Sequence, residues 1–155
     1  MSLKEELGLD QPIETIEHEC LLNIVYTGTI FSKLSYRFFS KTEITDAQFN
    51  VLMQLKYSKQ QKLSQVDLSK RLFVNRADVT GLIDRLEKGG YVKRGSHPTD
   101  RRINLIAITS KGLELLEHLE QDYFKEVNRI FGNFAKKDIK DLINNLEKIR
   151  QQAAK

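Results

Sequence analysis

The sequence has a single cysteine, Cys20, so no disulfide can form within the chain. No apolar run approaches the roughly 20 residues that a membrane-spanning helix needs. The first 19 residues are acidic and lack the apolar core of a signal peptide, so we expect the chain to stay in the cytoplasm and not to bind membranes. These absences favour a cytoplasmic globular protein.

The sequence also lacks the short motifs with which many enzymes bind phosphate, activate a nucleophile or hold a metal. It has no glycine-rich phosphate loop and no Gly-x-Ser-x-Gly, Cys-x-x-Cys or His-Glu-x-x-His. His18 and Cys20 are two residues apart and diverge on a helix. His118 lies one turn past Glu114, but an exposed histidine on a charged helix explains it more simply. We therefore expect no enzymatic activity, no cofactor and no metal ion.

Positive charge is concentrated in the middle of the chain. The 155 residues carry a net charge of +4 and are 40% hydrophobic, which suits one soluble domain with a core of its own. The net charge is −5 over residues 1–19, +4 over 20–62, +5 over 63–111 and zero over 112–155. A concentrated basic surface attracts phosphate and releases its counterions. The distribution therefore favours a nucleic-acid partner, although a merely solvated basic surface is the simpler alternative.

The pattern in the basic region is that of a helix-turn-helix. One apolar helix face is predicted from residues that recur three and four positions apart, namely Val79, Leu82, Ile83 and Leu86. Asn75 is expected to cap this helix, and Gly89-Gly90 to end it. A shorter helix, with Ser64 as its N-cap, is predicted to run to Leu72. Two short helices joined this closely are typical of a motif whose second helix enters the DNA major groove.

After Gly90 the pattern changes to that of strands. Residues 91–94 and 102–109 are predicted to form a two-stranded hairpin, and most of the residues between them favour turns. The tip of this hairpin is basic, which is typical of the wing of a winged helix. His97 lies in the turn, where it could contact a phosphate or simply shape the loop.

The flanking segments are predicted to be helices. A long helix is expected to begin at Pro12 and to run to about Phe39, with two apolar faces. Thr45-Asp-Ala-Gln48 is a capping box for a helix to about Tyr57, and residues 59–62 are expected to be a polar linker. Beyond the wing, Thr109 is expected to cap a helix to about residue 133, followed by a last helix over 136–152.

These elements predict one domain, 1–155, that is mainly α-helical with a small β-hairpin wing. The winged helix-turn-helix would occupy 45–109. The segments 12–40 and 110–152 have more apolar surface than a minimal winged helix needs, so we expect them to form a homodimer interface.

Four segments in this order resemble the multiple-antibiotic-resistance regulator (MarR) family: Leu-Ser-Gln-Val-Asp-Leu-Ser-Lys-Arg-Leu72, Val79-Thr-Gly-Leu-Ile-Asp-Arg-Leu-Glu-Lys-Gly-Gly-Tyr-Val, Asp100-Arg-Arg and Ile108-Thr-Ser-Lys-Gly. The resemblance covers roughly residues 15–150 in layout and is strongest over 63–112. It implies a homodimeric transcriptional regulator, a repressor rather than an activator, bound to a pseudo-palindromic double-stranded DNA operator. It also implies that a small organic effector or an oxidant weakens DNA binding. The alternative from another class is a winged-helix module that binds acidic proteins without sequence-specific DNA binding.

Nine residues are candidates for DNA contact. Those on or next to the recognition helix are Asn75, Arg76, Thr80 and Arg85; the expected phosphate contacts before it are Ser64 and Lys70; those in the wing are Arg94, Arg101 and Arg102. Asp100 matches the Asp-x-Arg pattern of family wings. We expect it to hold one guanidinium in a fixed orientation by bidentate pairing.

The resemblance further implies an effector pocket beneath the dimer helices. Tyr26, Phe31 and Phe49 could line it, although such aromatic residues more often belong to the core. Relatives that sense organic hydroperoxides carry Cys-x-x-x-Tyr near the start of the first helix, whereas here the tyrosine is displaced to Tyr26. Acidic and apolar neighbours of Cys20 disfavour a thiolate. We expect Cys20 to be buried as a packing residue, with peroxide sensing as the alternative.

Overall fold

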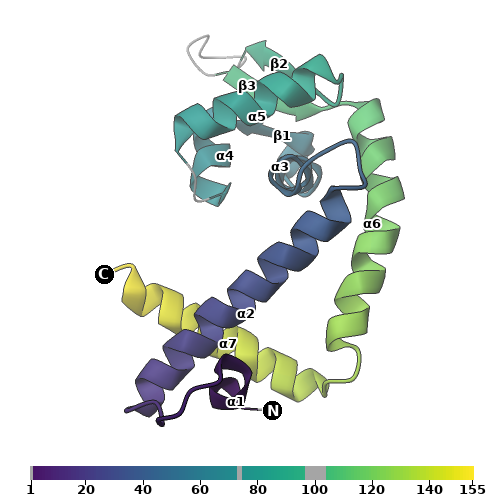
Figure 1. Ribbon diagram of the computed structural model, residues 1–155. Coiled ribbons are helices and arrows are strands. Elements are labelled where there is room, and N and C mark those ends of the chain that lie inside the picture. Colours follow the sequence, from purple (N-terminus) through teal and green to yellow (C-terminus); the bar gives the residue numbers. More distant parts are fainter. Residues whose placement is uncertain (1, 73–74, 97–103) are drawn as a thin grey trace.

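The computed structural model describes residues 2–72, 75–96 and 104–155 (Figure 1). The helices are α1 (Leu3–Leu7), α2 (Ile16–Phe39), α3 (Asp46–Lys56), the 3-10 turn η1 (Lys59–Gln61), α4 (Gln65–Leu72), α5 (Arg76–Lys88), α6 (Ser110–Phe131) and α7 (Lys136–Ala153). The strands are β1 (Lys62–Ser64), β2 (Val92–Ser96) and β3 (Asn104–Ile108). The predicted class, mainly helical with a small sheet, is confirmed.

A winged-helix lobe at one end is built from α3, α4, α5 and the sheet (Figure 1). Helices α2 and α6 extend from this lobe, and α7 lies at the opposite end of the molecule (Figure 1). None of the helices in the described residues is both long and apolar enough to cross a membrane.

The helix starts follow their capping residues. The Thr45 hydroxyl accepts a hydrogen bond from the Gln48 backbone N–H at 3.3 Å, and the Gln48 side-chain oxygen accepts one from the Thr45 backbone N–H at 2.9 Å, which confirms the predicted capping box. Asn75 caps α5 through the backbone N–H of Asp78, at 2.9 Å. Thr109 caps α6 in the same way, as expected.

The N-terminal region differs from the prediction in two ways. The long helix begins at Ile16 rather than at Pro12, because Thr15 accepts the backbone N–H of His18 at 3.2 Å and so caps the first turn. Upstream, residues 3–7 form α1, a helix that was not predicted. Ser2 and Glu5 make a complete capping box for this short helix.

The sheet has one strand more than the hairpin predicted. Residues 62–64 were expected to lie in or next to a linker but pair as β1 with β3, with Leu63 opposite Ile106, and the strand order is β1-β3-β2. The third strand hydrogen-bonds the second edge of β3, which a two-stranded hairpin would leave exposed. It also buries Leu63, which is 8% exposed.

The core fills the lobe and continues along the first half of α6. Val79, Ile83 and Leu86 are fully buried, as predicted for the inner face of α5, and Leu116 of α6 is buried with them. The ring of Phe49 lies 5.1 Å from that of Phe39 and 5.0 Å from that of Tyr123, measured between centroids. Phe49 is therefore a core residue that joins α2, α3 and α6.

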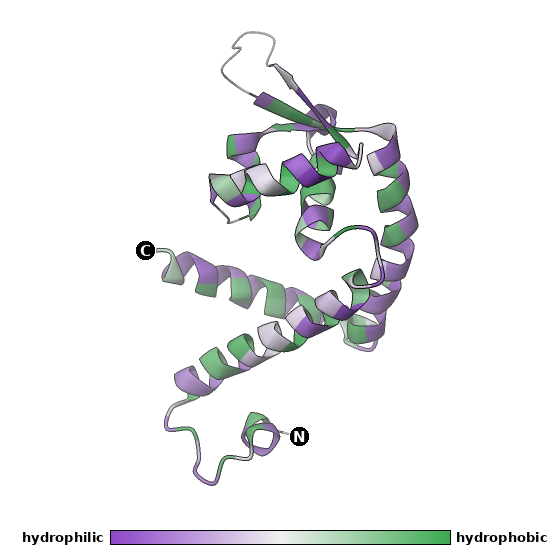
Figure 2. Cartoon of the chain, turned by 45° about the horizontal axis from the view of Figure 1, so that its top comes forward, coloured by the Kyte–Doolittle hydropathy of each residue, from purple (hydrophilic) through white to green (hydrophobic). Residues whose placement is uncertain are grey.

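At the end of the molecule opposite the lobe, the helices leave most of their apolar side chains exposed. No residue of α7 is buried, although apolar residues recur along it and along α2 (Figure 2). Leu21 and Val25 of α2 are 57% and 58% exposed, and Leu142 of α7 is 51% exposed. The isolated chain thus leaves apolar helix faces uncovered.

Candidate DNA-binding surface

Helix α5 presents a polar face to solvent because its apolar face is anchored in the core. Asp78, Asp84 and Arg85 are exposed on the side opposite the buried residues. The helix ends as predicted: Gly90 has a φ of 77°, and the backbone N–H groups of Gly90 and Tyr91 donate to the carbonyls of Glu87 and Leu86, both at 2.9 Å. The exposed polar face of α5 can therefore contact a partner along the length of the helix.

Helix α4 is fixed against the start of α5. The Gln65 amide donates to the Thr80 hydroxyl at 2.5 Å, so this candidate residue is already held by the neighbouring helix. The Ser64 hydroxyl accepts the Asp67 backbone N–H at 3.0 Å and donates to the Asp67 carboxylate at 2.7 Å. The predicted N-cap role of Ser64 is confirmed, and its phosphate contact stays a prediction, as does that of the exposed Lys70.

Arg94 lies in β2 but turns back to α5. Its guanidinium pairs with the carboxylates of Asp84 and Glu87, and its backbone N–H donates to Glu87 at 3.0 Å. Burial by itself would lower the pKa of Arg94, but the hydrogen bonds to the two carboxylates outweigh it and the pKa is raised. Arg94, which was expected to contact DNA, therefore forms ion pairs within the lobe, and these connect β2 to α5.

The other wing candidates, Asp100, Arg101 and Arg102, lie outside the described residues. Arg76 is the first residue of α5, next to the cap.

The turn after α5 is held by the start of α6. The Thr109 hydroxyl donates to the Gly90 carbonyl at 2.7 Å, and the Lys111 ammonium donates to the Gly89 carbonyl at 2.8 Å. The Tyr91 hydroxyl donates to the Glu43 carboxylate at 2.6 Å, and this hydrogen bond, assisted by burial, raises the pKa of Tyr91. Sequence reasoning missed Glu43 and Lys111, because their contacts join segments far apart in the chain.

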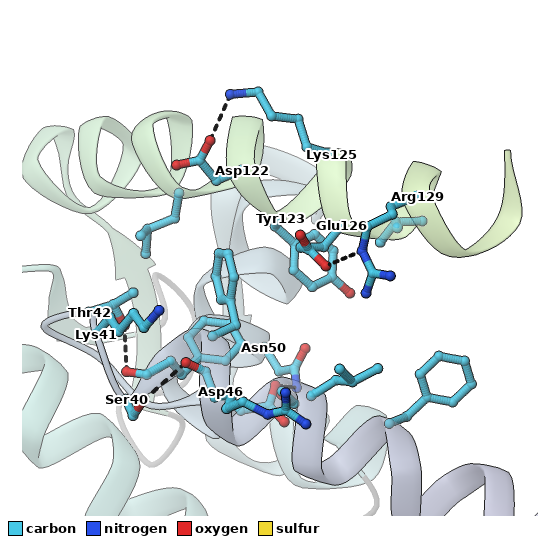
Figure 3. Close-up of a pocket in the computed structure, with 18 of the residues that line it drawn as sticks. Ser40, Lys41, Thr42, Asp46, Asn50, Asp122, Tyr123, Lys125, Glu126 and Arg129 are labelled. Atoms are coloured by element: carbon cyan, nitrogen blue, oxygen red, sulfur yellow. Dashed lines mark hydrogen bonds and ion pairs between the residues drawn. The ribbon is translucent and has the colours of Figure 1, made fainter.

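A cavity of about 1550 Å³ lies between α2, the loop after it, α3 and α6 (Figure 3). Its rim is charged: Lys125 pairs with Asp122 at 2.8 Å, and Arg129 with Glu126 at 2.9 Å. Of the three predicted lining residues, Phe31 borders this cavity; Tyr26 is not among the lining residues, and Phe49 is buried in the core. Glu43, the acceptor for Tyr91, also lines the cavity.

Cys20 is exposed in this chain, so the expected burial is wrong here. It lies in the first turns of α2, whose outer face has few neighbours in the isolated chain.

Among the described residues, no group of three or more histidine, cysteine or acidic side chains could hold a metal ion.

Comparison with known proteins gives one consistent result. A sequence model of the MarR family matches residues 42–103. The chain is 31% identical over 117 residues to the HTH-type transcriptional repressor YetL of Bacillus subtilis (strain 168), a match that covers 76% of this chain and 70% of YetL.

Solved structures share the fold of this chain. The fold is similar to Sco3205, a MarR family transcriptional regulator from Streptomyces coelicolor solved in complex with DNA (TM-score 0.78, 21% identity, 92% of each chain covered). It is also similar to a mutant MarR from Escherichia coli complexed with operator DNA (TM-score 0.71, 25% identity, 96% of this chain and 99% of that one).

Proposed function

Since this chain belongs to the MarR family of transcriptional regulators, we propose that it represses transcription as a homodimer bound to a pseudo-palindromic DNA operator. Each subunit places α5 in the major groove, and two copies of α5 one turn of DNA apart (roughly 34 Å) meet successive grooves. The observation that carries this proposal is the exposed polar face of α5, which includes Arg85, on a helix that hydrogen bonds connect to α4, β2 and α6.

We also propose that a small organic molecule regulates DNA binding from the cavity between α2 and α6. The geometry that supports this is the shared position of Glu43, which lines the cavity and accepts the hydrogen bond of Tyr91. Tyr91 directly follows the glycine pair that ends α5. A ligand that displaces the loop of Glu43 would therefore act on the end of the recognition helix.

The test begins with DNA selected in vitro from a random pool by the parent protein. The parent should bind the selected DNA far more tightly than a scrambled duplex in fluorescence anisotropy titrations. A protein that binds no selected sequence above background would contradict the proposal and favour the protein-interaction alternative.

Arg85→Ala should weaken binding to the selected DNA by about 1–3 kcal/mol, because an arginine that reads a guanine edge or a phosphate contributes on that scale. A base contact is recognised by relaxed preference at one base pair. A phosphate contact instead lowers affinity for all sequences and reduces the salt slope by about one. Lys137→Ala is the control, since it removes one positive charge from an exposed site on α7. If Arg85→Ala binds as the parent does, Arg85 is not a DNA contact.

Arg94→Ala should weaken operator binding by about 1 kcal/mol, roughly fivefold, because it releases β2 from α5 and leaves two acidic groups unpaired on the recognition helix. A double-mutant cycle with Glu87→Gln separates this role from a direct DNA contact. If Arg94 acts through Glu87, its replacement costs less in the Glu87→Gln background. An equal loss in both backgrounds would instead support the direct DNA contact that the sequence predicts.

A further inference from the structure

Gly81 is a glycine in the middle of α5. Glycine is unfavourable in a helix interior because it loses more backbone freedom on folding than alanine does. A glycine at such a position therefore calls for an explanation, and close packing within the chain is the first one to test.

Packing does not explain it. A Cβ added to Gly81 would have the Arg85 guanidinium as its nearest neighbour among the described residues, at 3.7 Å, which is an ordinary van der Waals contact. At Gly89, eight residues on, the added Cβ would lie 2.6 Å from the Tyr91 ring. The fold itself thus crowds position 89, whereas the described part of the chain leaves room for a side chain at position 81.

The position of Gly81 on the helix surface suggests an explanation that packing within the chain does not provide. It lies between the buried Val79 and Ile83, on the outward side of the helix. Ala77 one turn before it and Arg85 one turn after it are both exposed. Gly81 is therefore at the centre of the face that the proposed function directs at DNA, and the Arg85 guanidinium lies next to it.

We propose that Gly81 is a DNA-contact position, where the missing side chain lets the α5 backbone lie directly against base edges in the major groove. This inference rests on the proposed function and extends it to a residue without a side chain. The close approach brings Arg85 within reach of the base pairs, so a Cβ at position 81 moves the helix away from the bases and weakens its contacts with them. Gly81 thus contributes to DNA sequence specificity because the absence of a side chain lets the helix approach the bases.

The experiment measures stability and DNA binding of the same variant. Gly81→Ala should raise the melting temperature by roughly 2–4 °C, because alanine favours the helix. The same variant should bind the selected DNA roughly 5- to 150-fold more weakly, the range expected from forcing a methyl group into a packed contact. The larger Gly81→Val should bind it more weakly still. Because no phosphate contact is removed, the salt slope and the affinity for scrambled DNA should stay near those of the parent.

The rise in melting temperature separates a contact effect from unfolding. A more stable Gly81→Ala variant with parental affinity for the selected DNA would overturn the inference and leave the proposed function intact. A lower melting temperature would overturn its premise that the fold has room for a Cβ. A parent protein that shows no sequence preference at all would remove the proposed function itself, and this inference with it.

Discussion

A chain that carries both Leu142→Glu and Ile149→Glu should sediment as a monomer of 18.0 kDa, whereas the parent chain should sediment at twice that mass. The two side chains are 51% and 41% exposed and lie two turns apart on the apolar face of α7, a helix with no buried residue. An amphipathic helix of this kind gains its stability from a partner surface, which in the proposed homodimer is a second copy of the chain. Two carboxylates at the centre of that interface cannot be desolvated without a large cost.

The DNA affinity of this variant should fall by roughly 10²–10⁴-fold, because a monomer engages one half-site and loses the effective concentration that the second subunit provides. The matched control is Asn144→Glu with Gln151→Glu, which adds the same charges at the same spacing on the opposite face of α7. Control and parent should behave alike in sedimentation and DNA binding. If the parent itself sediments as a monomer at micromolar concentration, the dimer proposal is wrong.

Local patterns in the sequence predicted most of the elements of the fold. Asn75, Thr109 and the Thr45–Gln48 box were found correctly because a cap needs only residues within one turn of it. The inner face of α5 was found because burial follows the helical period. Pro12 was misleading, since Thr15 offers a competing cap that the apolar pattern does not reveal.

Contacts between distant segments could not be predicted in this way. The pairing of Leu63 with Ile106 makes a strand of residues 62–64, at the end of the expected linker, and no local sequence pattern predicts it. The DNA contact of Arg94, expected because its charge suits phosphate, stays a prediction, but its pairing with two carboxylates of α5 was not predicted. The exposure of Cys20 depends on what covers the outer face of α2, which one chain does not contain. Predicting these features requires the fold, because each depends on a neighbour that is distant in the sequence or belongs to another molecule.

The start of α6 packs closely against the winged-helix lobe at Gly112. The backbone N–H of Thr109 donates to the Tyr91 carbonyl at 3.0 Å, and the first turn of α6 lies directly against that carbonyl. A Cβ on Gly112 would lie 2.3 Å from the Tyr91 oxygen and 2.8 Å from Cγ1 of Ile108. The oxygen belongs to the backbone of the turn that ends α5, so it cannot rotate away as a side chain would.

Gly112→Ala should therefore lower the free energy of unfolding by roughly 2–4 kcal/mol, from overpacking together with loss or distortion of the Thr109 hydrogen bond. Chemical denaturation measures this loss. An unchanged m-value would show that the variant exposes as much surface on unfolding as the parent does. Gly81→Ala is the paired control: the same substitution, also within a helix, should stabilise the chain where the described residues leave room for it. If both variants were stabilised, the contact between α6 and the Tyr91 carbonyl could not be as close as described. Opposite signs would instead support the close contact between the first turn of α6 and the turn that ends α5, through which we expect a displacement of α6 in the proposed dimer to reach α5.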